Sequence, residues 1–277
     1  MSFQSSLSGI NASATKLDVI GVNVANAQTV GFKESKAQFA DLFANNIAGG
    51  QVGTGAANLT LAQQFQQGNL EASASPLDIA ISGKGFFQVM RPDGALVYSR
   101  NGQFHVEGDN PEDTVGYLKT MDGSKVMGAN GPIQIDMTRY AGTLRISPEG
   151  VIQGNDGVTR GPDRVVPDPD NVGQTITVPG EQVYQTLGVL QLHTFRNING
   201  LENRGDNQWG ETPDSGARVS GAPGAGVLGL VQSGMTEAST TDLNENLVRM
   251  IIAQREYQGN SQALKIQNDM DLKLIRG

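Results

Sequence analysis

The sequence predicts an α+β protein with long helices at both ends of the chain, paired in a coiled-coil-like manner, and a central all-β antiparallel barrel or sandwich. Apolar residues recur at spacings of three and four near both ends. Between them, turn-forming Asp-Gly and Asn-Gly dipeptides separate short β-rich runs. We therefore expect a terminal helical domain from residues 1–30 with 240–277, a connector over 31–75 and a β-domain over 76–239.

The first helix is predicted over residues 4–26. Its apolar positions form a heptad seam of about three repeats, with polar residues between them. The segment Asn26-Ala27-Gln28-Thr29, followed by Gly31, ends the pattern. The seam consists of Phe3, Leu7, Ile10, Ala14, Leu17, Gly21 and Val24.

The last helix is predicted over residues 242–275 and repeats this rhythm. Thr241 or Asp242 is a suitable N-cap, and Glu245 places an acid in the first turn. Because apolar residues lie on more than one face, we expect burial against several neighbours. One line contains Leu243, Leu247, Met250, Tyr257 and Leu264, interrupted by Gln254 and Ser261, and a second contains Ile252, Ala263, Ile266, Met270 and Leu274.

The middle of the chain is predicted to be antiparallel β-structure. The region 161–173 holds three prolines, which remove ladder donors, so we expect an irregular loop there. The Gly- and Ala-rich stretches 45–58 and 220–229 show no periodicity and are expected to be connectors. The expected strands cover Phe86–Met90, Leu96–Ser99, Gln103–Val106, Ile133–Met137, Leu144–Ser147 and Gly188–Phe195.

Charge is distributed unevenly along the chain. The net charge is −8, yet the charged residues within 1–30 cancel, as do those within 242–277. The helical ends can therefore crowd together without net repulsion, while the acidic middle stays solvated. Because its net charge is negative, the chain has no overall electrostatic attraction for nucleic acid or anionic lipid.

No catalytic, cofactor or metal site is predicted. Cysteine is absent, and the histidines His105 and His193 lie in expected strands without a second ligand at metal-binding spacing. Gly83-Lys84-Gly85 precedes a strand, whereas a phosphate loop needs a helix N-terminus. The acidic pairs Asp168 with Asp170, and Asp109 with Glu112-Asp113, are interpreted as solvated turns.

No apolar run is long enough for membrane insertion, and no classical signal peptide is visible. Taken alone, these observations favour a cytoplasmic protein.

Several motifs, in order along the chain, resemble those of the flagellar hook and rod axial proteins. Departures from the family pattern are small: Val22 stands where the family usually repeats Asn, and Asp271 where an apolar residue is common. The stretch 108–180 matches poorly, so its strand order is not predicted. The matching motifs are Leu7-Ser8-Gly9-Ile10-Asn11-Ala12, Leu17 to Asn26, Val30-Gly31-Phe32-Lys33, Leu77 to Phe87, Tyr98 to Phe104, Phe195 to Trp209, Asp242-Leu243, Met250-Ile251, Ala253-Gln254-Arg255, Tyr257-Gln258 and Asn260.

The resemblance implies a structural subunit, not an enzyme, that polymerises into a hollow helix. The paired terminal helices would form the inner wall, the β-domain the outer layer, and the connector would adjust stiffness. Implied partners are further copies of the chain, neighbouring axial and junction proteins, the flagellar export apparatus and a capping protein. The location implied is the extracellular hook or the periplasm-spanning basal body, reached without a cleaved signal peptide.

Within the family, a short hook-type subunit is favoured over a basal-body rod subunit. Between Asp41 and Gly55 the chain passes directly from Phe43-Ala44-Asn45 to Gly49-Gly50, as in hook proteins, whereas the distal-rod protein carries a longer insertion. Typical hook proteins are, however, longer and have an extra outer domain. More distant alternatives are a trimeric adhesin or tail-fibre-like protein and a wall-degrading hydrolase.

The predicted subunit interface combines the seam residues with polar residues placed to form hydrogen bonds between subunits. A lone helical hairpin or homodimeric coiled coil would explain the same seams without a polymer. The interface consists of Leu7, Ile10, Ala14, Leu17, Val24, Asn23, Asn26, Leu243, Leu247, Met250, Gln254, Tyr257 and Leu264.

Overall fold

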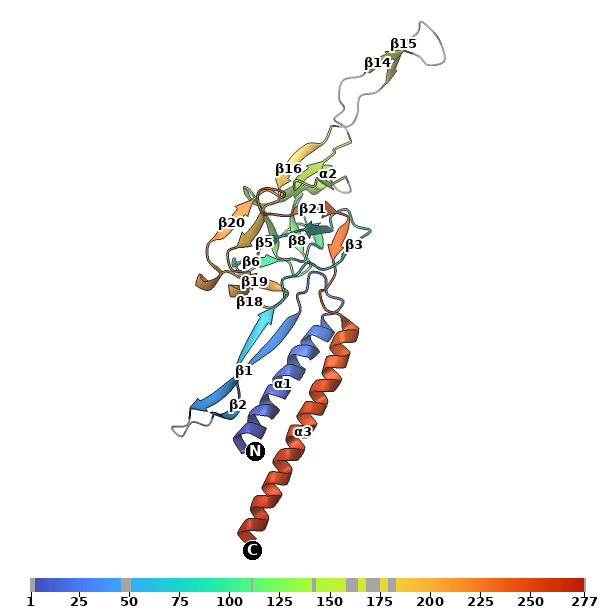
Figure 1. The fold of residues 1–277 in the computed structure, drawn as a ribbon. Helices are drawn as coiled ribbons and strands as arrows, with labels where there is room; N and C mark the ends of the chain where they lie inside the picture. Colours follow the sequence, from blue (N-terminus) through green and yellow to red (C-terminus); the bar gives the residue numbers. More distant parts are fainter. Residues whose placement is uncertain are drawn as a thin grey trace. The chain divides into compact units, whose positions relative to one another are not determined.

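The computed structural model describes residues 3–45, 51–110, 112–140, 143–157, 164–167, 175–178 and 183–276 (Figure 1). The chain divides into two compact units. The terminal unit comprises Met1–Gly68 with Ser239–Gly277, and the β unit comprises Asn69–Ala238.

Both long helices form where the sequence predicts them. α1 spans Phe3–Ala25 and α3 spans Leu243–Arg276. Asp242 caps α3, because its Oδ1 accepts hydrogen bonds from the backbone N–H groups of Asn244 (2.9 Å) and Glu245 (3.1 Å). α1 lies against α3 in an antiparallel arrangement (Figure 1).

The Gly- and Ala-rich stretch expected to be a connector instead contributes to an antiparallel hairpin. β1 (Ser35–Asn45) pairs with β2 (Gln51–Gln63), with register shifts between Gln38 and Ala40 and between Leu42 and Phe43. The prediction of a connector over 45–58 was wrong over its described residues, because that prediction relied on the lack of apolar periodicity. A hairpin satisfies backbone donors and acceptors without periodicity, and this one also packs along α1.

The β unit is built from short strands. They are β3 (Leu70–Ala72), β4 (Ile79–Ser82), β5 (Phe86–Met90), β6 (Leu96–Ser99), β7 (Phe104–Glu107), β8 (Val115–Thr120), β9 (Lys125–Gly128), β10 (Gly131–Pro132), β11 (Gln134–Asp136), β12 (Arg145–Ile146), β13 (Val151–Gly154), β14 (Arg164–Pro167), β15 (Thr175–Val178), β16 (Gln185–Val189), β17 (Leu192–Phe195), β18 (Glu202–Asn203), β19 (Gln208–Gly210), β20 (Arg218–Gly221), β21 (Leu230–Ser233) and β22 (Met235–Glu237). A short helix α2 (Met137–Tyr140) and 3-10 turns at Ile198–Gly200 and Pro213–Ser215 interrupt them.

The predicted mixture of helices with a central antiparallel sheet region is confirmed. The main sheet follows the order β11-β8-β9-β5-β6-β19-β18, with β7 added to β8, β10 to β9, β17 to β5 and β20 to β17. Smaller sheets pair β12-β13-β16, β14-β15, β4-β21 and β3-β22. Among the described strands, these pairings do not show a closed barrel.

Two details of the predicted β pattern were wrong. The run Gly188–Phe195 divides between β16 and β17, and Leu190 between them forms an isolated antiparallel bridge with Gly128. Within the expected loop 161–173, Arg164–Pro167 is a strand that pairs with β15. Proline is tolerated there because it ends a two-stranded ribbon, where its missing N–H breaks no interior ladder.

Side chains on opposite faces of β5 enter two different buried clusters. Phe87 is 0% exposed and joins the main core, which includes Ile79, Leu118, Ile152 and Leu192. Because consecutive strand residues point to opposite faces, Phe86 joins an aromatic cluster. That cluster contains Tyr98, His193, Phe195 and Trp209, with the Phe86 and Trp209 ring centroids 5.6 Å apart.

The turn dipeptides behave as expected for two different reasons. Gly94 and Gly123 adopt φ of 85° and 81°, which non-glycine residues rarely adopt. At Gly102 the constraint is space: an added Cβ would lie 1.7 Å from the carbonyl oxygen of Ile79.

Candidate assembly interface

The most deeply buried residues of α1 and α3 are mostly small or polar. On α1, Ser6, Ser13 and Ile20 are buried, one heptad apart. On α3, Asn246 and Ala253 are buried at the same spacing. This is a seven-residue repeat in which Ile20 is the only large apolar member among the described residues.

Glycine allows the two helices to approach closely. A Cβ added at Gly9 would lie 2.8 Å from Nδ2 of Asn260, so the bare backbone accommodates that amide. On the exposed edge of the contact, Lys16 Nζ lies 3.0 Å from Glu256 Oε2. An exposed ion pair of this kind contributes roughly 0.2–1 kcal/mol and serves mainly to fix register.

The predicted interface residues are more buried on α1 than on α3. Most of those on α1 are at least half-buried, and Asn23 is fully buried. On α3, Met250 and Leu264 are half-buried, whereas Leu243, Leu247, Gln254 and Tyr257 remain exposed. The remaining predicted positions on α1 are Ile10, Ala14, Leu17, Val24 and Asn26, all half-buried, and Leu7, which is 43% exposed.

Sequence reasoning missed the residues at the centre of the contact within the chain. Ser6, Ser13 and Ile20 lie one position before or three after the predicted seam, and Ala253 lies three after Met250. These residues could have been found from the seven-residue spacing of small and polar residues along both helices. That spacing was overlooked because heptad searches look for large apolar side chains.

The large apolar side chains of α3 are largely exposed. Leu247 is 42% exposed and Ile251 is 52% exposed. Large apolar side chains that are exposed together along one helix typically mark a surface for another protein. Similar exposure occurs at Leu243, Val248, Ile252, Ile266, Met270 and Leu272.

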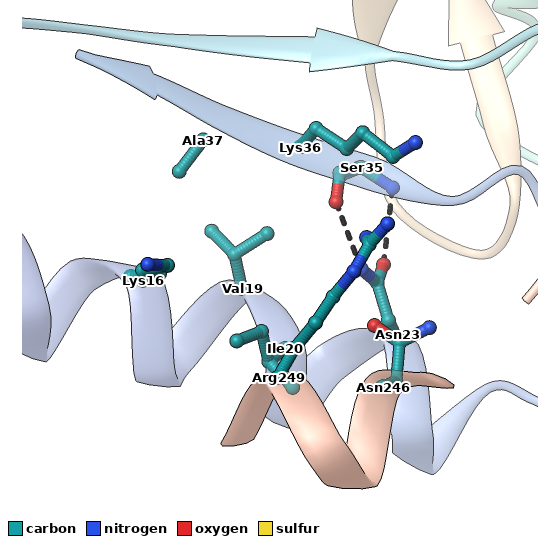
Figure 2. Close-up of a pocket in the computed structure, with 9 residues that line it drawn as sticks. All are labelled: Lys16, Val19, Ile20, Asn23, Ser35, Lys36, Ala37, Asn246 and Arg249. Carbon is teal, nitrogen blue, oxygen red and sulfur yellow. Dashed lines mark hydrogen bonds between the residues drawn. The ribbon is translucent and has the colours of Figure 1, made fainter. Parts of the chain in front are cut away.

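Beside the helix pair lies a pocket of about 300 Å³ between α1, β1 and the start of α3 (Figure 2). Asn23 closes one end by bonding twice to Ser35. Its Nδ2 donates to the carbonyl oxygen of Ser35 at 2.8 Å, and its Oδ1 accepts from the N–H of Ser35 at 3.0 Å. These reciprocal bonds fix the hairpin to the end of α1.

Glu34 joins the hairpin to α3 through Asn246 and Arg249, two residues that line this pocket. Its carboxylate lies 3.0 Å from Nη1 of Arg249 and accepts from Nδ2 of Asn246 at 3.3 Å. Its N–H donates to Oγ1 of Thr240 at 2.9 Å, and its carbonyl accepts from Gln64. Buried Glu34 thus ties together the hairpin and the start of α3.

Among the residues described, no grouping of side chains is suited to holding a metal ion. His105 lies in β7 and His193 in β17, and no cluster of three metal-ligating side chains occurs in the described ranges. Asp109 is paired with Lys125 at 2.6 Å, which holds the pKa of that carboxyl below its usual range. Asp168 and Asp170 lie outside the described residues.

Neither long helix has, in the part of the chain that is described, the length and hydrophobicity to cross a membrane.

Comparison with known protein families gives three matches in chain order. Residues 3–33 match the flagella basal body rod protein model, and residues 80–154 match the flagellar hook protein FlgE/F/G D1 domain. Residues 232–276 match the flagellar basal body rod FlgEFG protein C-terminal model.

Curated relatives span almost the whole chain. The flagellar basal-body rod protein FlgG of Buchnera aphidicola subsp. Baizongia pistaciae is 32% identical over 280 residues, covering 96% of this chain and 95% of the relative. FlgG of Bacillus subtilis is 32% identical over 290 residues, covering 99% and 97%. The flagellar hook protein FlgE of Salmonella typhimurium is 27% identical over 399 residues, covering 98% of both chains.

Proposed function

The chain belongs to the family of flagellar hook and basal-body rod proteins, and we propose that within it the chain is the hook subunit, polymerising through its terminal helices. It is a structural subunit of the bacterial flagellum and not an enzyme. Family membership also implies self-polymerisation within the axial structure.

The observation that carries the assembly mechanism is the exposed apolar surface of α3. The buried residues of α3, Asn246 and Ala253, are polar or small, while Leu247, Ile251 and Ile252 remain roughly half exposed. Full burial of a large apolar side chain contributes roughly 1.5–3 kcal/mol, so burying the exposed half contributes about 1 kcal/mol per residue. Several such residues per copy are enough to drive association.

The sequence feature that favours the hook assignment is the direct passage from Phe43-Ala44-Asn45 to Gly49-Gly50. Relatives of both kinds match the chain, at 27% identity over 399 positions for the hook protein and 32% over 280 positions for the rod protein.

Chain length favours the second candidate, a basal-body rod subunit. The alignment with the rod protein spans 280 positions for a chain of 277 residues, whereas the hook alignment spans 399. Most of the additional positions therefore have no counterpart in this chain. A hook subunit with this sequence would lack a part of the chain that is present in that relative.

In the proposed polymer the terminal unit forms the inner wall and the β unit the outer layer. The helices would pair in a coiled-coil-like manner, supported by the heptad contacts of Ser13, Ile20 and Ala253. Neighbouring axial and junction proteins, the export apparatus and a capping protein are the proposed partners. Export without a cleaved signal peptide to the extracellular hook is the proposed route.

Negative-stain microscopy of purified Leu247→Asp tests this function. Because the new carboxylate would have to be buried at a subunit contact, we expect open tubes from the unaltered chain and none from this variant. Leu96→Asp is the matched control, since Leu96 lies in the β unit and is 45% exposed against 42% for Leu247. Tubes formed equally by both variants would refute assembly through α3, and curved tubes would support a hook over a rod.

A further inference from the structure

The turn that joins β18 to β19 contains the tripeptide Arg204-Gly205-Asp206, at one end of the main sheet. All three residues are exposed. The side chain of Arg204 is 53% exposed and that of Asp206 is 72% exposed. The strand that follows is anchored by Trp209, which is 1% exposed and packs against Phe86. The tip of this hairpin therefore presents a cation and an anion to solvent from a buried base.

Hydrogen bonds fix the backbone of the tip. The N–H of Arg204 donates to the carbonyl of Gln208 at 2.9 Å, and the N–H of Gln208 donates to the carbonyl of Gly205 at 2.9 Å. From the neighbouring turn, Nη2 of Arg91 donates to the carbonyl of Arg204 at 3.0 Å. Because the tip is already ordered in the free chain, a partner that binds it pays little for ordering it.

Turn geometry explains two of the three residues. Gly205 and Asp206 adopt φ of 82° and 52°, in the left-handed region that glycine adopts freely and aspartate tolerates. Arg204 precedes the left-handed positions, and the turn places no requirement on its side chain. The fold therefore does not require that a guanidinium and a carboxylate flank this glycine.

Both charged groups of the tip take part in ion pairs within the chain. Nη2 of Arg204 lies 2.8 Å from Oε2 of Glu202, and Oδ2 of Asp206 lies 3.4 Å from Nη2 of Arg91. Glu202 is itself 54% exposed, and ion pairs with exposed partners are weak. Breaking one of them to bind a partner lowers the affinity by no more than about 5-fold. Neither pair prevents recognition of the tip.

The chemistry of the two side chains indicates what would recognise them. A carboxylate is a preferred ligand of Mg²⁺, Ca²⁺ and Mn²⁺, and a guanidinium binds carboxylates through two parallel hydrogen bonds. We propose that Arg204-Gly205-Asp206 binds an adhesion receptor of the integrin type, which holds the aspartate on a divalent cation and the arginine in an acidic cleft. All three residues belong to the β unit, so this inference goes beyond the proposed function and does not depend on it.

The net charge of the β unit makes the divalent cation necessary. This unit carries the whole net charge of −8, so an acidic receptor surface would repel it at long range. Contact with such a receptor must then come from the tip itself, with the cation between the two carboxylate-bearing partners. Removal of the cation is therefore expected to abolish binding, not merely to weaken it.

Biolayer interferometry with the full-length monomeric chain tests this proposal. The probe is an immobilised integrin ectodomain that binds Arg-Gly-Asp peptides, in buffer containing Mn²⁺. We expect saturable binding that is lost in EDTA and displaced by a soluble Arg-Gly-Asp peptide. Asp206→Asn should weaken binding at least about 50-fold, because a neutral amide is a poorer ligand for the cation while asparagine keeps the left-handed backbone.

Asp214→Asn is the matched control, since Asp214 is an exposed aspartate of the β unit outside the tip, and it should change binding less than about 2-fold. Fluorescence of Trp209, the single tryptophan of the sequence, reports whether the hairpin base is intact in each variant. If Asp206→Asn alters that signal, Arg204→Gln decides instead, because it leaves the left-handed residues unchanged and should weaken binding at least about 10-fold.

Three results would overturn the proposal: no binding by the unaltered chain, binding that persists in EDTA, or equal binding by the unaltered chain and the tip variants. Tube formation is assayed separately on the same preparations. A chain that forms tubes and does not bind the receptor refutes this inference alone, whereas a chain that binds the receptor and forms no tubes refutes only the proposed function.

Discussion

The two units bury opposite kinds of side chain. In the β unit, large apolar residues such as Ile79, Phe87 and Trp209 are at most 1% exposed. In the terminal unit, the buried positions of the helices are mostly small or polar, and Leu247 and Ile251 are exposed. The net charge differs too: the β unit has 12 basic and 20 acidic residues and so carries the whole −8, while the terminal unit is neutral.

This difference separates folding from assembly. The β unit completes its core within one chain, so its stability does not require partners. In the proposed polymer, the exposed apolar residues of the terminal unit form contacts with other copies, whereas the buried residues of its helices are mostly small or polar. Substitutions that affect only folding or only assembly test this division. The largest effect is expected in the core of the β unit.

Truncating a core residue should damage the β unit alone. Phe87→Ala removes a fully buried ring that packs edge-on against Phe104 at 5.2 Å, so we expect a loss of about 4–5 kcal/mol in the free energy of unfolding. Leu247→Ala, in the terminal unit, should change monomer stability by less than about 1 kcal/mol while weakening polymerisation. Denaturant titration of both monomers measures this, and equal losses would remove the distinction.

A buried ion pair secures the last strand of the β unit. Arg100 Nη1 lies 3.2 Å from Glu237 Oε2, and their side chains are 6% and 0% exposed. Arg100→Met leaves the carboxylate buried without this cation, so we expect a loss of about 3–4 kcal/mol. The double variant Arg100→Met/Glu237→Leu should recover most of this in the same titration, and no recovery would contradict the assignment.

Acid should weaken the β unit through His193. This residue is 2% exposed, and burial, reinforced by the nearby positive charge of Arg218, lowers its pKa to about 4 from the ordinary 6.5. Because the unfolded chain takes up this proton at higher pH, stability is unaffected above pH 6.5 and falls as pH drops from 6.5 to 4. The loss reaches about 3 kcal/mol below pH 4. His193→Leu should lack this component, and thermal unfolding of both proteins from pH 7 to pH 3.5 provides the comparison.

Salt should promote polymerisation modestly. Copies with a charge of −8 on each β unit repel one another, and the Debye length shortens from about 30 Å at 0.01 M to about 10 Å at 0.1 M salt. We expect the critical concentration, measured by sedimentation, to fall several-fold over this range. A rise would mean that ion pairs between copies, not apolar contacts, dominate assembly.

Local signals in the sequence determined both helices and several strands. Helix limits of 4–26 and 242–275 compare with α1 at Phe3–Ala25 and α3 at Leu243–Arg276, because periodicity and the Asp242 cap act within a few residues. The runs Phe86–Met90 and Leu96–Ser99 coincide with β5 and β6 for the same reason. The motifs shared with hook and rod proteins likewise identified the class of protein, because each is a short run of consecutive residues that is recognised without tertiary context.

Only the tertiary structure decided which face of each helix is used within the chain. Ser13 and Ala253 are buried because the helices approach closely at Gly9, and close approach selects small residues by space, not by hydrophobicity. The hairpin of β1 and β2 is similarly non-local: its stability comes from paired backbone groups and packing on α1, neither of which leaves a periodic pattern in the sequence. A sequence pattern shows which residues of a segment are suited to burial. Whether they are buried against the same chain or against a neighbouring copy depends on which surfaces meet in space.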